Sequence, residues 1–405
     1  MKRKFCVIMG CIIILLSPIV NKININAAAY EKTNETVDKI TIEDLKIYEN
    51  DIRKYIETFA NHIEKSKKVS TENIVPVYDN DDQIVGCCVS LVSGKKEYGY
   101  VNLDFRSENM ITDFSIALGA SSPVEVISEK IKDNAEKIKK IETKKLYKVD
   151  FVDYGVGYID DNGKKRYMVG TDDMNNKEFE HLQDINEEFD EKMENSSTTT
   201  KYSSFSKIWS SGVPGQVTET ATYIKQYSKP KSLISESSVE NATNKYACAV
   251  VALTEIAQQE NISNSSLKTT FNNLWNKTGT TIDHTMSGIT YGTTQDSKLA
   301  SGMKSYATSR NASCTCTTKS NPPVSFFVNA VKNNLSSTLS MRILKTSGET
   351  SGHTVSVVGY CKSYYSAVTH TYVIVANGWY SDAPVFIDYN NVDFVNTYGV
   401  TYDIG

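Results

Sequence analysis

A cysteine, a histidine and an asparagine in the second half of the chain have the types and the order that nucleophilic hydrolysis requires. Cys248 begins an apolar run in which Val250, Leu253 and Ile256 recur at helical spacing. The sequence therefore predicts that the thiol lies in the first turn of a helix. The positive end of the helix dipole and the backbone N–H groups of that turn both favour a thiolate, which is the nucleophilic form of cysteine.

The other two residues can complete the catalytic set. His353 follows a glycine at the start of an alternating apolar strand, and histidine exchanges protons near neutral pH. Asn377 stands at the end of a second strand, where its side chain can orient the imidazole ring. Trp379 follows and can shield that hydrogen bond from water. We expect a structural or exposed role for His370 and a loop position for His284.

The donor that would stabilise the oxyanion has two candidates. Asn241 and Asn244 precede the cysteine, and an amide side chain can donate a hydrogen bond to a developing negative charge. Glu240 cannot do so when it is ionised. Asn241 is the preferred donor. In the alternative, both asparagines only shape the turn before the helix, and the Cys248 backbone N–H is the donor.

The elements that position these residues form an α+β domain, expected over residues 206–405. Besides the helix at Cys248, we expect helices at 265–277 and 322–335. The expected strands are 340–345, 353–362, 369–379, 383–389 and 399–404. A helix that bears the cysteine and packs on an antiparallel sheet is the arrangement that this order favours.

The first half of the chain forms a second, smaller α+β domain, expected over residues 30–190. A helix is predicted in 41–68, and another begins at Ser122, where Pro123 and Glu125 complete a capping box and an apolar stripe continues to Ile138. Strands are predicted around the turn at 80–82, at 97–105, and in a hairpin over 146–170. His62 and His181 lie in charged stretches and are expected at the surface, so no catalytic set is predicted here.

A polar segment, residues 191–205, joins the two domains. It is rich in serine and threonine and poor in apolar residues, which is typical of an exposed linker that proteases cut easily. We expect any maturation cut between about 186 and 230.

The N-terminus predicts export. Basic residues 2–4 precede an apolar run from Phe5 to about Val20, and small residues follow at 27–29. This order is typical of a secretory signal peptide, here residues 1–29. The run is short for a membrane span of about 20 residues. We therefore expect cleavage and a secreted protein, free or at the cell surface, without a stable membrane anchor; a retained N-terminal anchor is the alternative.

Composition and charge exclude several functional classes. The 405 residues carry a formal net charge of −4 and a pI of about 5.9, whereas a nucleic-acid-binding face would be basic. The chain has no nucleotide-binding loop and no Gly-x-Ser-x-Gly signature of serine hydrolases. No metal motif competes with the cysteine, so we expect no cofactor and no metal.

Six of the eight cysteines remain after cleavage of the signal peptide. They are too sparse for a disulfide scaffold, although single disulfides can form in an exported chain. Cys361 is either a buried thiol or the partner of Cys314 or Cys316. No histidine or second cysteine pair lies near Cys314 and Cys316, so a zinc site is not expected.

The order of these motifs and their flanks resembles the papain-fold cysteine peptidases of bacteria, in particular the peptidase C39-like family and, more distantly, the streptopain-like peptidases. The resemblance covers about residues 235–395. It implies a papain-like fold with Cys248 as nucleophile, His353 as general base and acid, Asn377 as the residue that orients His353, and Trp379 covering the pair. Two features depart from the family: Ala249 and Val250 replace the usual Gly-Pro, and no glutamine precedes the cysteine.

The resemblance also implies that the first domain is a propeptide, which folds ahead of the enzyme and blocks its cleft as an intramolecular inhibitor. The expected function is a secreted cysteine peptidase made as a zymogen, which acts on a protein or peptide substrate. One alternative is a Cys-His amidase that acts on cell-wall peptide. Another is an inactive papain-like binding or adhesion module, and a separate binding domain is the alternative for the first half.

Overall fold

The computed structural model describes residues 39–79, 82–106, 110–133, 138–148, 154–160, 165–169, 216–222, 233–286, 288–344, 350–365, 368–378, 383–390 and 396–405. The predicted signal peptide, the predicted linker, His181 and Trp379 lie outside these ranges. We call residues 39–169 the N-terminal half and residues 216–405 the C-terminal half. In the described ranges, no helix is both long enough and apolar enough to cross a bilayer.

Two helices open the N-terminal half where the sequence predicts one. α1 (Ile42–Ile47) begins at a capping box: Thr41 Oγ1 accepts from the Asp44 N–H at 3.2 Å, and the Asp44 carboxylate accepts from the Thr41 N–H at 2.8 Å. α2 (Glu49–Ile63) starts after a break at Tyr48. The buried stripe of α2 consists of Ile52, Tyr55, Ile56, Phe59 and Ala60. The sequence thus predicted helical structure here but not the break at Tyr48.

The N-terminal strands are β1 (Ser70–Tyr78), β2 (Ile84–Ser93), β3 (Lys96–Asp104), β4 (Ile111–Ile116), β5 (Ile138–Lys148), β6 (Tyr154–Asp160) and β7 (Lys165–Val169). Neighbouring strands pair antiparallel, apart from β1 and β5, which pair parallel. The predicted hairpin near the end of this half is confirmed as β6 and β7.

The helix predicted at Ser122 is shorter than the apolar stripe suggests. α3 (Pro123–Asp133) begins at the predicted capping box, in which the Ser122 N–H donates to Glu125 Oε2 at 2.6 Å and the Glu125 N–H donates to Ser122 Oγ at 3.3 Å. The predicted continuation to Ile138 is wrong, because β5 begins there. This strand pairs with both β1 and β6, so the sheet hydrogen bonds override the helical spacing of the isoleucines.

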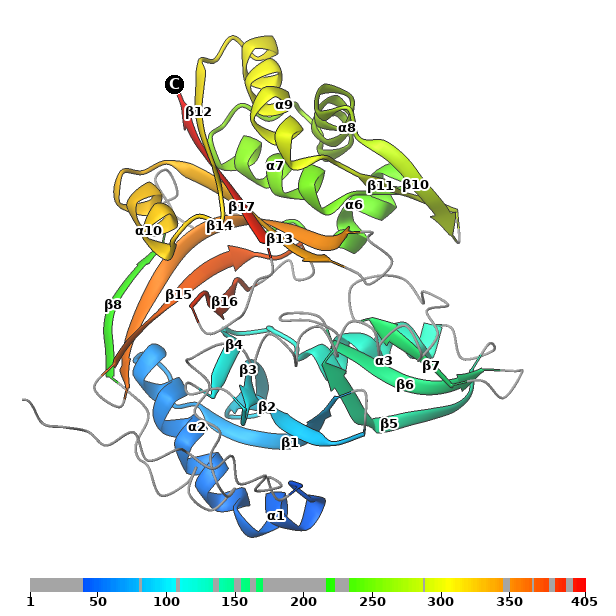
Figure 1. The fold of residues 1–405 in the computed structure, drawn as a ribbon, viewed down its shortest axis with the longest axis vertical. Helices are drawn as coiled ribbons and strands as arrows, with labels where there is room; N and C mark the ends of the chain where they lie inside the picture. The colour runs from blue at the N-terminus through cyan, green and yellow to red at the C-terminus, as the bar shows by residue number, and fades with distance from the viewer. Residues whose placement is uncertain are drawn as a thin grey trace, which may run out of the picture. The chain divides into compact units, whose positions relative to one another are not determined.

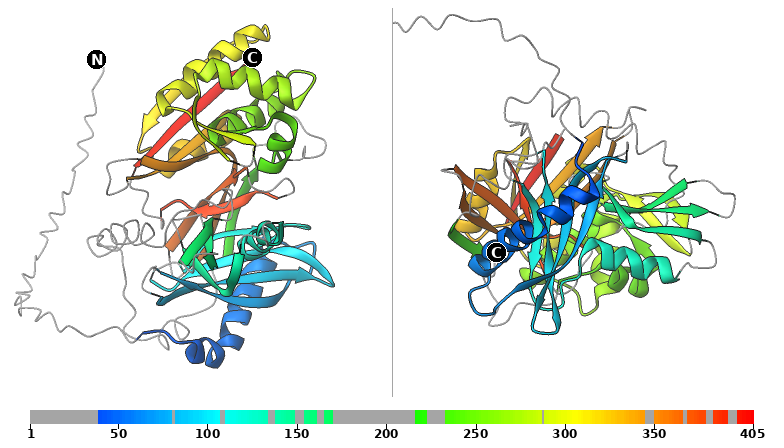
Figure 2. Two further views of the ribbon diagram at one scale, coloured as in Figure 1. Left: turned by 90° about the vertical axis from the view of Figure 1, so that its right-hand side faces the viewer. Right: turned by 90° about the horizontal axis from the view of Figure 1, so that it is seen from below.

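The C-terminal helices are α6 (Glu236–Thr243), α7 (Cys248–Gln259), α8 (Leu267–Thr278), α9 (Asp296–Ser309) and α10 (Val324–Lys332). Those predicted at Cys248, 265–277 and 322–335 are confirmed as α7, α8 and α10. The sequence did not predict α6 and α9. Both α7 and α10 pack against strands β13 and β14, and α8 and α9 gather beside α7 (Figure 1 and the left view of Figure 2).

The C-terminal strands are β8 (Gln216–Thr222), β9 (Lys245–Tyr246), β10 (Thr281–Met286), β11 (Ile289–Thr293), β12 (Cys314–Ser320), β13 (Ser336–Leu344), β14 (Thr350–Tyr365), β15 (Val368–Ala376), β16 (Val385–Asp388) and β17 (Asn396–Ile404). The five predicted strands are confirmed as β13 to β17. The small sheet β10-β11-β9 and the strands β8 and β12 were not predicted.

The fold is α+β, as predicted, and is built on one large mixed sheet. Its strand order is β12-β17-β13-β14-β15-β16-β4-β3-β2-β1-β5-β6-β7, and β8 pairs with β14 off this path. The two halves meet where β16 pairs antiparallel with β4, with Phe386 opposite Phe114. The Ser115 hydroxyl also donates to the Pro384 carbonyl at 2.9 Å. The sheet therefore continues from one half into the other.

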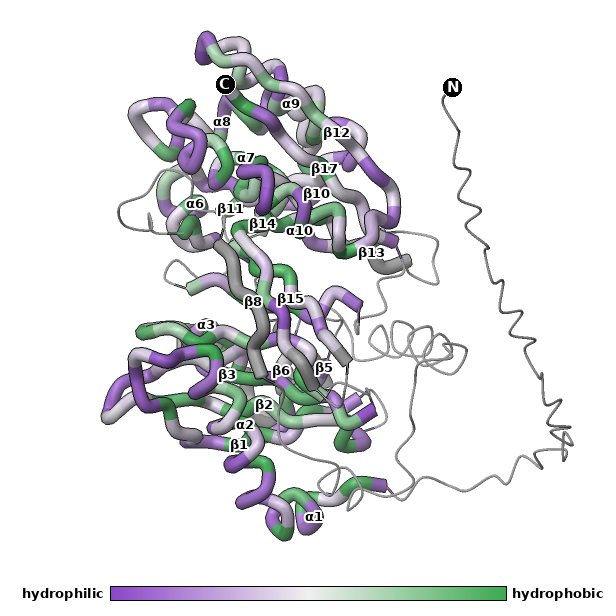
Figure 3. The backbone as a smooth tube through the Cα atoms, turned by 90° about the vertical axis from the view of Figure 1, so that its left-hand side faces the viewer, coloured by the Kyte–Doolittle hydropathy of each residue, from purple (hydrophilic) through white to green (hydrophobic). Residues whose placement is uncertain are grey.

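An aromatic cluster at this junction shows that the two halves also share a core. Phe114 of β4 stacks on Phe386 of β16 with ring centroids 4.5 Å apart, and its edge meets Tyr372 of β15 at 5.1 Å. Phe59 of α2 packs edge-on to Phe114 at 4.9 Å. A separate apolar cluster lies between α7, α8, α9, β12 and β17. Hydrophobic and hydrophilic segments alternate along the chain in both halves (Figure 3).

Candidate active site

Cys248 is the first residue of helix α7, as the sequence predicts. Ala247 precedes it in an extended conformation, with φ −158° and ψ 116°, and its carbonyl accepts from the N–H groups of Val250 and Val251 at 2.9 and 3.0 Å. Most of α7 is buried, whereas Cys248 itself is partly exposed. The thiol therefore lies at the positive end of a helix that is fixed by its surroundings, where an anion is favoured.

His353 and Asn377 come together at the edge between β14 and β15. The strand register pairs Ser356 with Ala376, the last residue of β15, so the chain leaves the sheet at Asn377 close to the start of β14. His353 is partly exposed, and its Nε2 lies 2.6 Å from the carbonyl oxygen of Asn377. The acceptor in this hydrogen bond is the main-chain carbonyl oxygen.

That contact decides which ring nitrogen of His353 can take up a proton. A carbonyl oxygen can only accept a hydrogen bond, so Nε2 carries the hydrogen and donates it to Asn377. In the neutral imidazole the basic lone pair is then on Nδ1. His353 is therefore held in the tautomer in which Nδ1 is the proton acceptor.

Gly378, the residue after Asn377, lies near the start of α7. Its φ is +80°, in the left-handed region that glycine tolerates. A Cβ built on Gly378 would lie 3.5 Å from Val251 Cγ1 and 3.7 Å from the Tyr246 hydroxyl. These two residues flank Cys248 in the sequence. The structure therefore places the turn at Asn377 and Gly378 beside residues on either side of Cys248. The observed contact to His353 uses the main chain of Asn377, whereas the sequence predicts that its side chain orients the ring.

Residues 234–236, at the start of α6, form hydrogen bonds both to the turn at Gly378 and to α7. The sequence did not predict these contacts. The Glu236 N–H donates to the Gly378 carbonyl at 2.5 Å, and the Ile234 N–H donates to Glu255 Oε2 of α7 at 2.9 Å. Glu255 is only 5% exposed. A lone carboxylate in the apolar helix was the available signal, because a buried charge needs a partner.

The two oxyanion candidates occupy different positions in α6. Asn241 lies within the helix and is exposed. Asn244 caps its C-terminus in the left-handed conformation, with φ 55°, and its backbone N–H donates to the Glu240 carbonyl at 2.8 Å. The Asn244 carbonyl accepts from Thr290 N–H at 3.0 Å. The left-handed cap accounts for an asparagine at position 244, and these contacts use its backbone and not its side-chain amide.

The two other histidines of the C-terminal half have partners of their own. His370 of β15 lies 3.3 Å from the carboxylate of Asp388, which is fully buried on β16. His284 was predicted in a loop, which is wrong: it lies on β10, stacks on Tyr291 at 4.8 Å between ring centroids, and contacts Asp283 at 2.9 Å. Strand pairing of β10 with β11 explains the difference.

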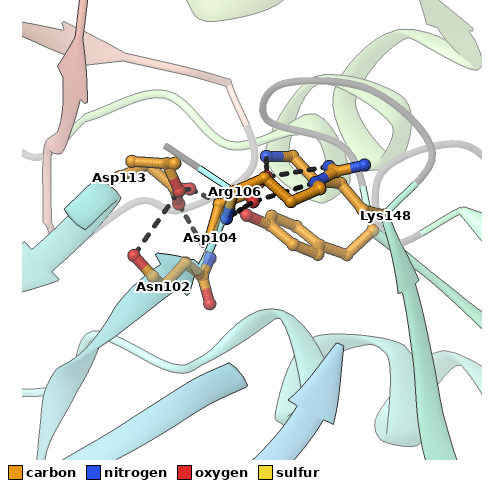
Figure 4. A network of polar contacts seen from close by, with 7 residues as sticks. Asn102, Asp104, Arg106, Asp113 and Lys148 are labelled. Carbon is orange, nitrogen blue, oxygen red and sulfur yellow. Dashed lines mark hydrogen bonds and ion pairs between the residues drawn. The ribbon is translucent and has the colours of Figure 1, made fainter. Parts of the chain in front are cut away.

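The N-terminal half also contains a buried polar network that the sequence analysis missed (Figure 4). Asp104 accepts from Arg106 and from Lys148, each at 2.8 Å. Burial alone would raise the pKa of Asp104, but the two cations outweigh it and hold the pKa below its ordinary value. Asp104 and Arg106 are two residues apart, whereas Lys148 comes from the distant strand β5, which sequence proximity could not indicate.

Asp113 is the second carboxyl of this network. Burial raises its pKa to about 6, although Tyr154 at 2.8 Å and Asn102 at 2.9 Å donate hydrogen bonds to it. Asp113 lies on β4, opposite Ile387 of the other half. The network therefore joins strands of the N-terminal half at the junction with β16.

No family model matches the sequence, and no curated protein matches it.

Proposed function

We propose that the chain is a secreted cysteine peptidase that hydrolyses peptide bonds with Cys248, His353 and Asn377. The observation that carries the proposal is the hydrogen bond from His353 Nε2 to the Asn377 carbonyl, in a turn that lies beside Tyr246 and Val251, on either side of Cys248. A thiol at a helix start and a histidine held in one tautomer are the two parts that thiol catalysis needs.

The chemistry follows from these positions. His353 Nδ1 takes the proton of the Cys248 thiol, and the thiolate attacks the substrate carbonyl carbon. The negative charge on the oxygen is stabilised by backbone N–H groups of the first turn of α7, with Asn241 as a further candidate donor. The imidazolium then gives its proton to the leaving amine, and a thioester forms. Water, deprotonated by His353, hydrolyses the thioester and restores the thiol.

The papain-like assignment rests on the helix that bears the cysteine and on its packing against an antiparallel sheet, β13 and β14. We propose that the N-terminal half is the prodomain of this enzyme. The β4–β16 pairing and the cluster around Phe114 support its role as an intramolecular partner. Because these contacts share one core, we expect the prodomain to stay bound after a cut in the linker.

The test is hydrolysis of fluorogenic peptides by the complete secreted chain, before and after linker cleavage, together with labelling by an epoxide inhibitor at mildly acidic pH. We expect one adduct at Cys248, and both readouts should be lost in Cys248→Ala and His353→Ala. His370→Ala is the matched control, because it also removes a partly buried strand histidine. Equal losses in His353→Ala and His370→Ala would argue against the proposal.

One further candidate is an inactive binding or adhesion module, because Ala249 and Val250 follow the cysteine and no glutamine lies in the residues just before it. The capping contacts of Asn244 use its backbone, so its side-chain amide and that of the exposed Asn241 both remain candidate donors for the oxyanion. If folded protein gives no preferential adduct at Cys248, the binding module is the better assignment. An adduct with cleavage of muropeptides but not of proteins would identify the cell-wall amidase instead.

A further inference from the structure

Two other cysteines lie side by side, away from the candidate active site. Cys314 and Cys316 are two residues apart on β12, the outermost strand at one end of the large sheet, so their side chains share a face. Their sulfur atoms are 3.5 Å apart. Cys314 is 6% exposed, whereas Cys316 is partly exposed and contacts the Ala300 carbonyl of α9 at 3.6 Å.

The surroundings make the two sulfurs chemically different. A hydrogen bond from Cys314 lowers the pKa of Cys316, against its own burial, and Lys304 of α9 lowers it further. The same hydrogen bond, burial and Asp403 raise the pKa of Cys314. These shifts favour deprotonation of Cys316, the more accessible sulfur, over deprotonation of the buried Cys314. A partly exposed thiolate beside a lysine is the kind that reacts with disulfides.

The spacing allows the two sulfurs to bond. Residues i and i+2 of a strand are about 6.6 Å apart at the α-carbons, within the range of about 4.4–6.8 Å that disulfides span. The sulfurs need to approach by about 1.5 Å to reach bonding distance, which rotation about the Cα–Cβ bonds can supply. The six cysteines that the structure describes are all thiols. Cys361 packs in a different apolar cluster from Cys314. Of the two states predicted for Cys361, a buried thiol or a disulfide partner, the structure has the buried thiol.

We propose that Cys314 and Cys316 are a redox-active thiol pair, which a low-molecular-weight disulfide oxidises to an intramolecular disulfide. The Cys316 thiolate attacks one sulfur of the disulfide RSSR, forms a mixed disulfide and releases one thiolate, which is protonated to RSH. The Cys314 thiol then loses its proton and attacks the Cys316 sulfur, which releases the second RSH. Two protein thiols and RSSR give one protein disulfide and two RSH. The proposal does not depend on the peptidase activity.

The full secreted chain tests this, with Cys248→Ala as background so that the candidate nucleophile does not consume the oxidant. The protein is treated with glutathione disulfide at pH 7, alkylated and digested with trypsin. Cleavage after Arg310 and Lys319 leaves both cysteines on one peptide, residues 311–319. We expect this peptide to lose two hydrogens and to carry no glutathione, and dithiothreitol should reverse the change.

Single substitutions separate the two roles. Cys314→Ser should accumulate glutathione on Cys316, and Cys316→Ser should leave Cys314 reacting at least about tenfold more slowly than Cys316 does. Lys304→Gln should slow oxidation, whereas Lys298→Gln, also exposed on α9, should not. A peptide that stays a dithiol, or one that keeps glutathione in the native chain, would overturn the proposal. So would equal oxidation of the buried Cys87 and Cys88, because the reactivity would then not belong to this site.

Discussion

Replacing Gly378 by alanine tests how the candidate site is held together. Gly378 has φ +80°, and an L-residue in the left-handed conformation costs about 1–2 kcal/mol. Its added Cβ would make ordinary contacts, 3.5 Å from Val251 and 3.7 Å from Tyr246, so the cost lies in the backbone and not in a clash. Relief of that strain turns the Asn377 carbonyl away from His353.

The expected loss can be worked out from that cost. A penalty of about 1–2 kcal/mol lowers the population of the active geometry by a factor of about 5–30. We expect kcat/KM for a fluorogenic peptide, per folded molecule, to fall by that factor in Gly378→Ala. The rate of Cys248 labelling by the epoxide inhibitor should fall in parallel.

Gly119→Ala is the matched control. Gly119 has φ +82°, and nothing lies within 4 Å of an added Cβ, so it carries the same backbone penalty in the N-terminal half. Both variants should lose similar stability in thermal unfolding, and only Gly378→Ala should lose activity. Equal activity in the two variants would refute the role assigned to the turn at Asn377 and Gly378.

Three further predictions concern stability. Glu255→Ala leaves the buried Ile234 N–H without its acceptor and should lower the free energy of unfolding, measured in urea, by about 1–3 kcal/mol. Glu255→Gln keeps a carbonyl oxygen and should lower it less; equal losses in the two variants would contradict the assigned hydrogen bond. Burial raises the pKa of Asp113 to about 6 from the ordinary 3.8, so the folded state binds this proton more tightly than the unfolded state does. The free energy of unfolding should therefore increase by up to about 3 kcal/mol as the pH falls from 7 towards 4. Asp113→Asn should remove that gain, measured as the difference in unfolding free energy between pH 7 and pH 4.5, and an unchanged pH dependence would argue against it. After a protease cut between about 186 and 230, the two fragments should elute together in gel filtration. Phe114→Ala removes about 3–5 kcal/mol of packing and should weaken the association of the fragments. Separation of the fragments without this substitution and without denaturant would contradict the shared core.

The sequence predicted the parts of the site that depend on local periodicity. The apolar spacing after Cys248 placed the thiol in the first turn of α7, and alternation placed His353 on β14 and Asn377 just after β15. These signals need only neighbouring residues, because helix and strand periods are set by the backbone.

Local sequence periodicity could not predict the contacts that hold the site together. The hydrogen bond from His353 ends on a main-chain carbonyl, and every residue has one, so side-chain identity could not select Asn377 O. The sequence could mark Glu255 as an unusual buried carboxylate, but not Ile234 as its partner. That hydrogen bond depends on how the start of α6 packs beside α7. The residues next to Ile234 or Glu255 in the sequence do not indicate this packing.

The helix predicted to continue to Ile138 was wrong because long-range strand pairing outweighs local preference there. Residues 138–148 have isoleucines at helical spacing, yet they form β5, which pairs with β1 and β6. The pairing of β4 with β16 was not predicted either, because no strand was expected at 111–116 and the residues of one strand do not identify a partner far along the chain. The predicted pair of separate α+β domains therefore gave no sign of one sheet that runs through both.

The β4–β16 pairing also has a kinetic consequence. The Ser115–Pro384 hydrogen bond beside it joins residues 269 positions apart, so this contact closes one of the longest loops in the chain. Contacts of such separation form late, since the entropy of loop closure must be overcome first. The N-terminal half is synthesised first, and β4 then has an open edge until β16 arrives. The strand that unites the two halves is therefore also the place where aggregation competes longest with folding.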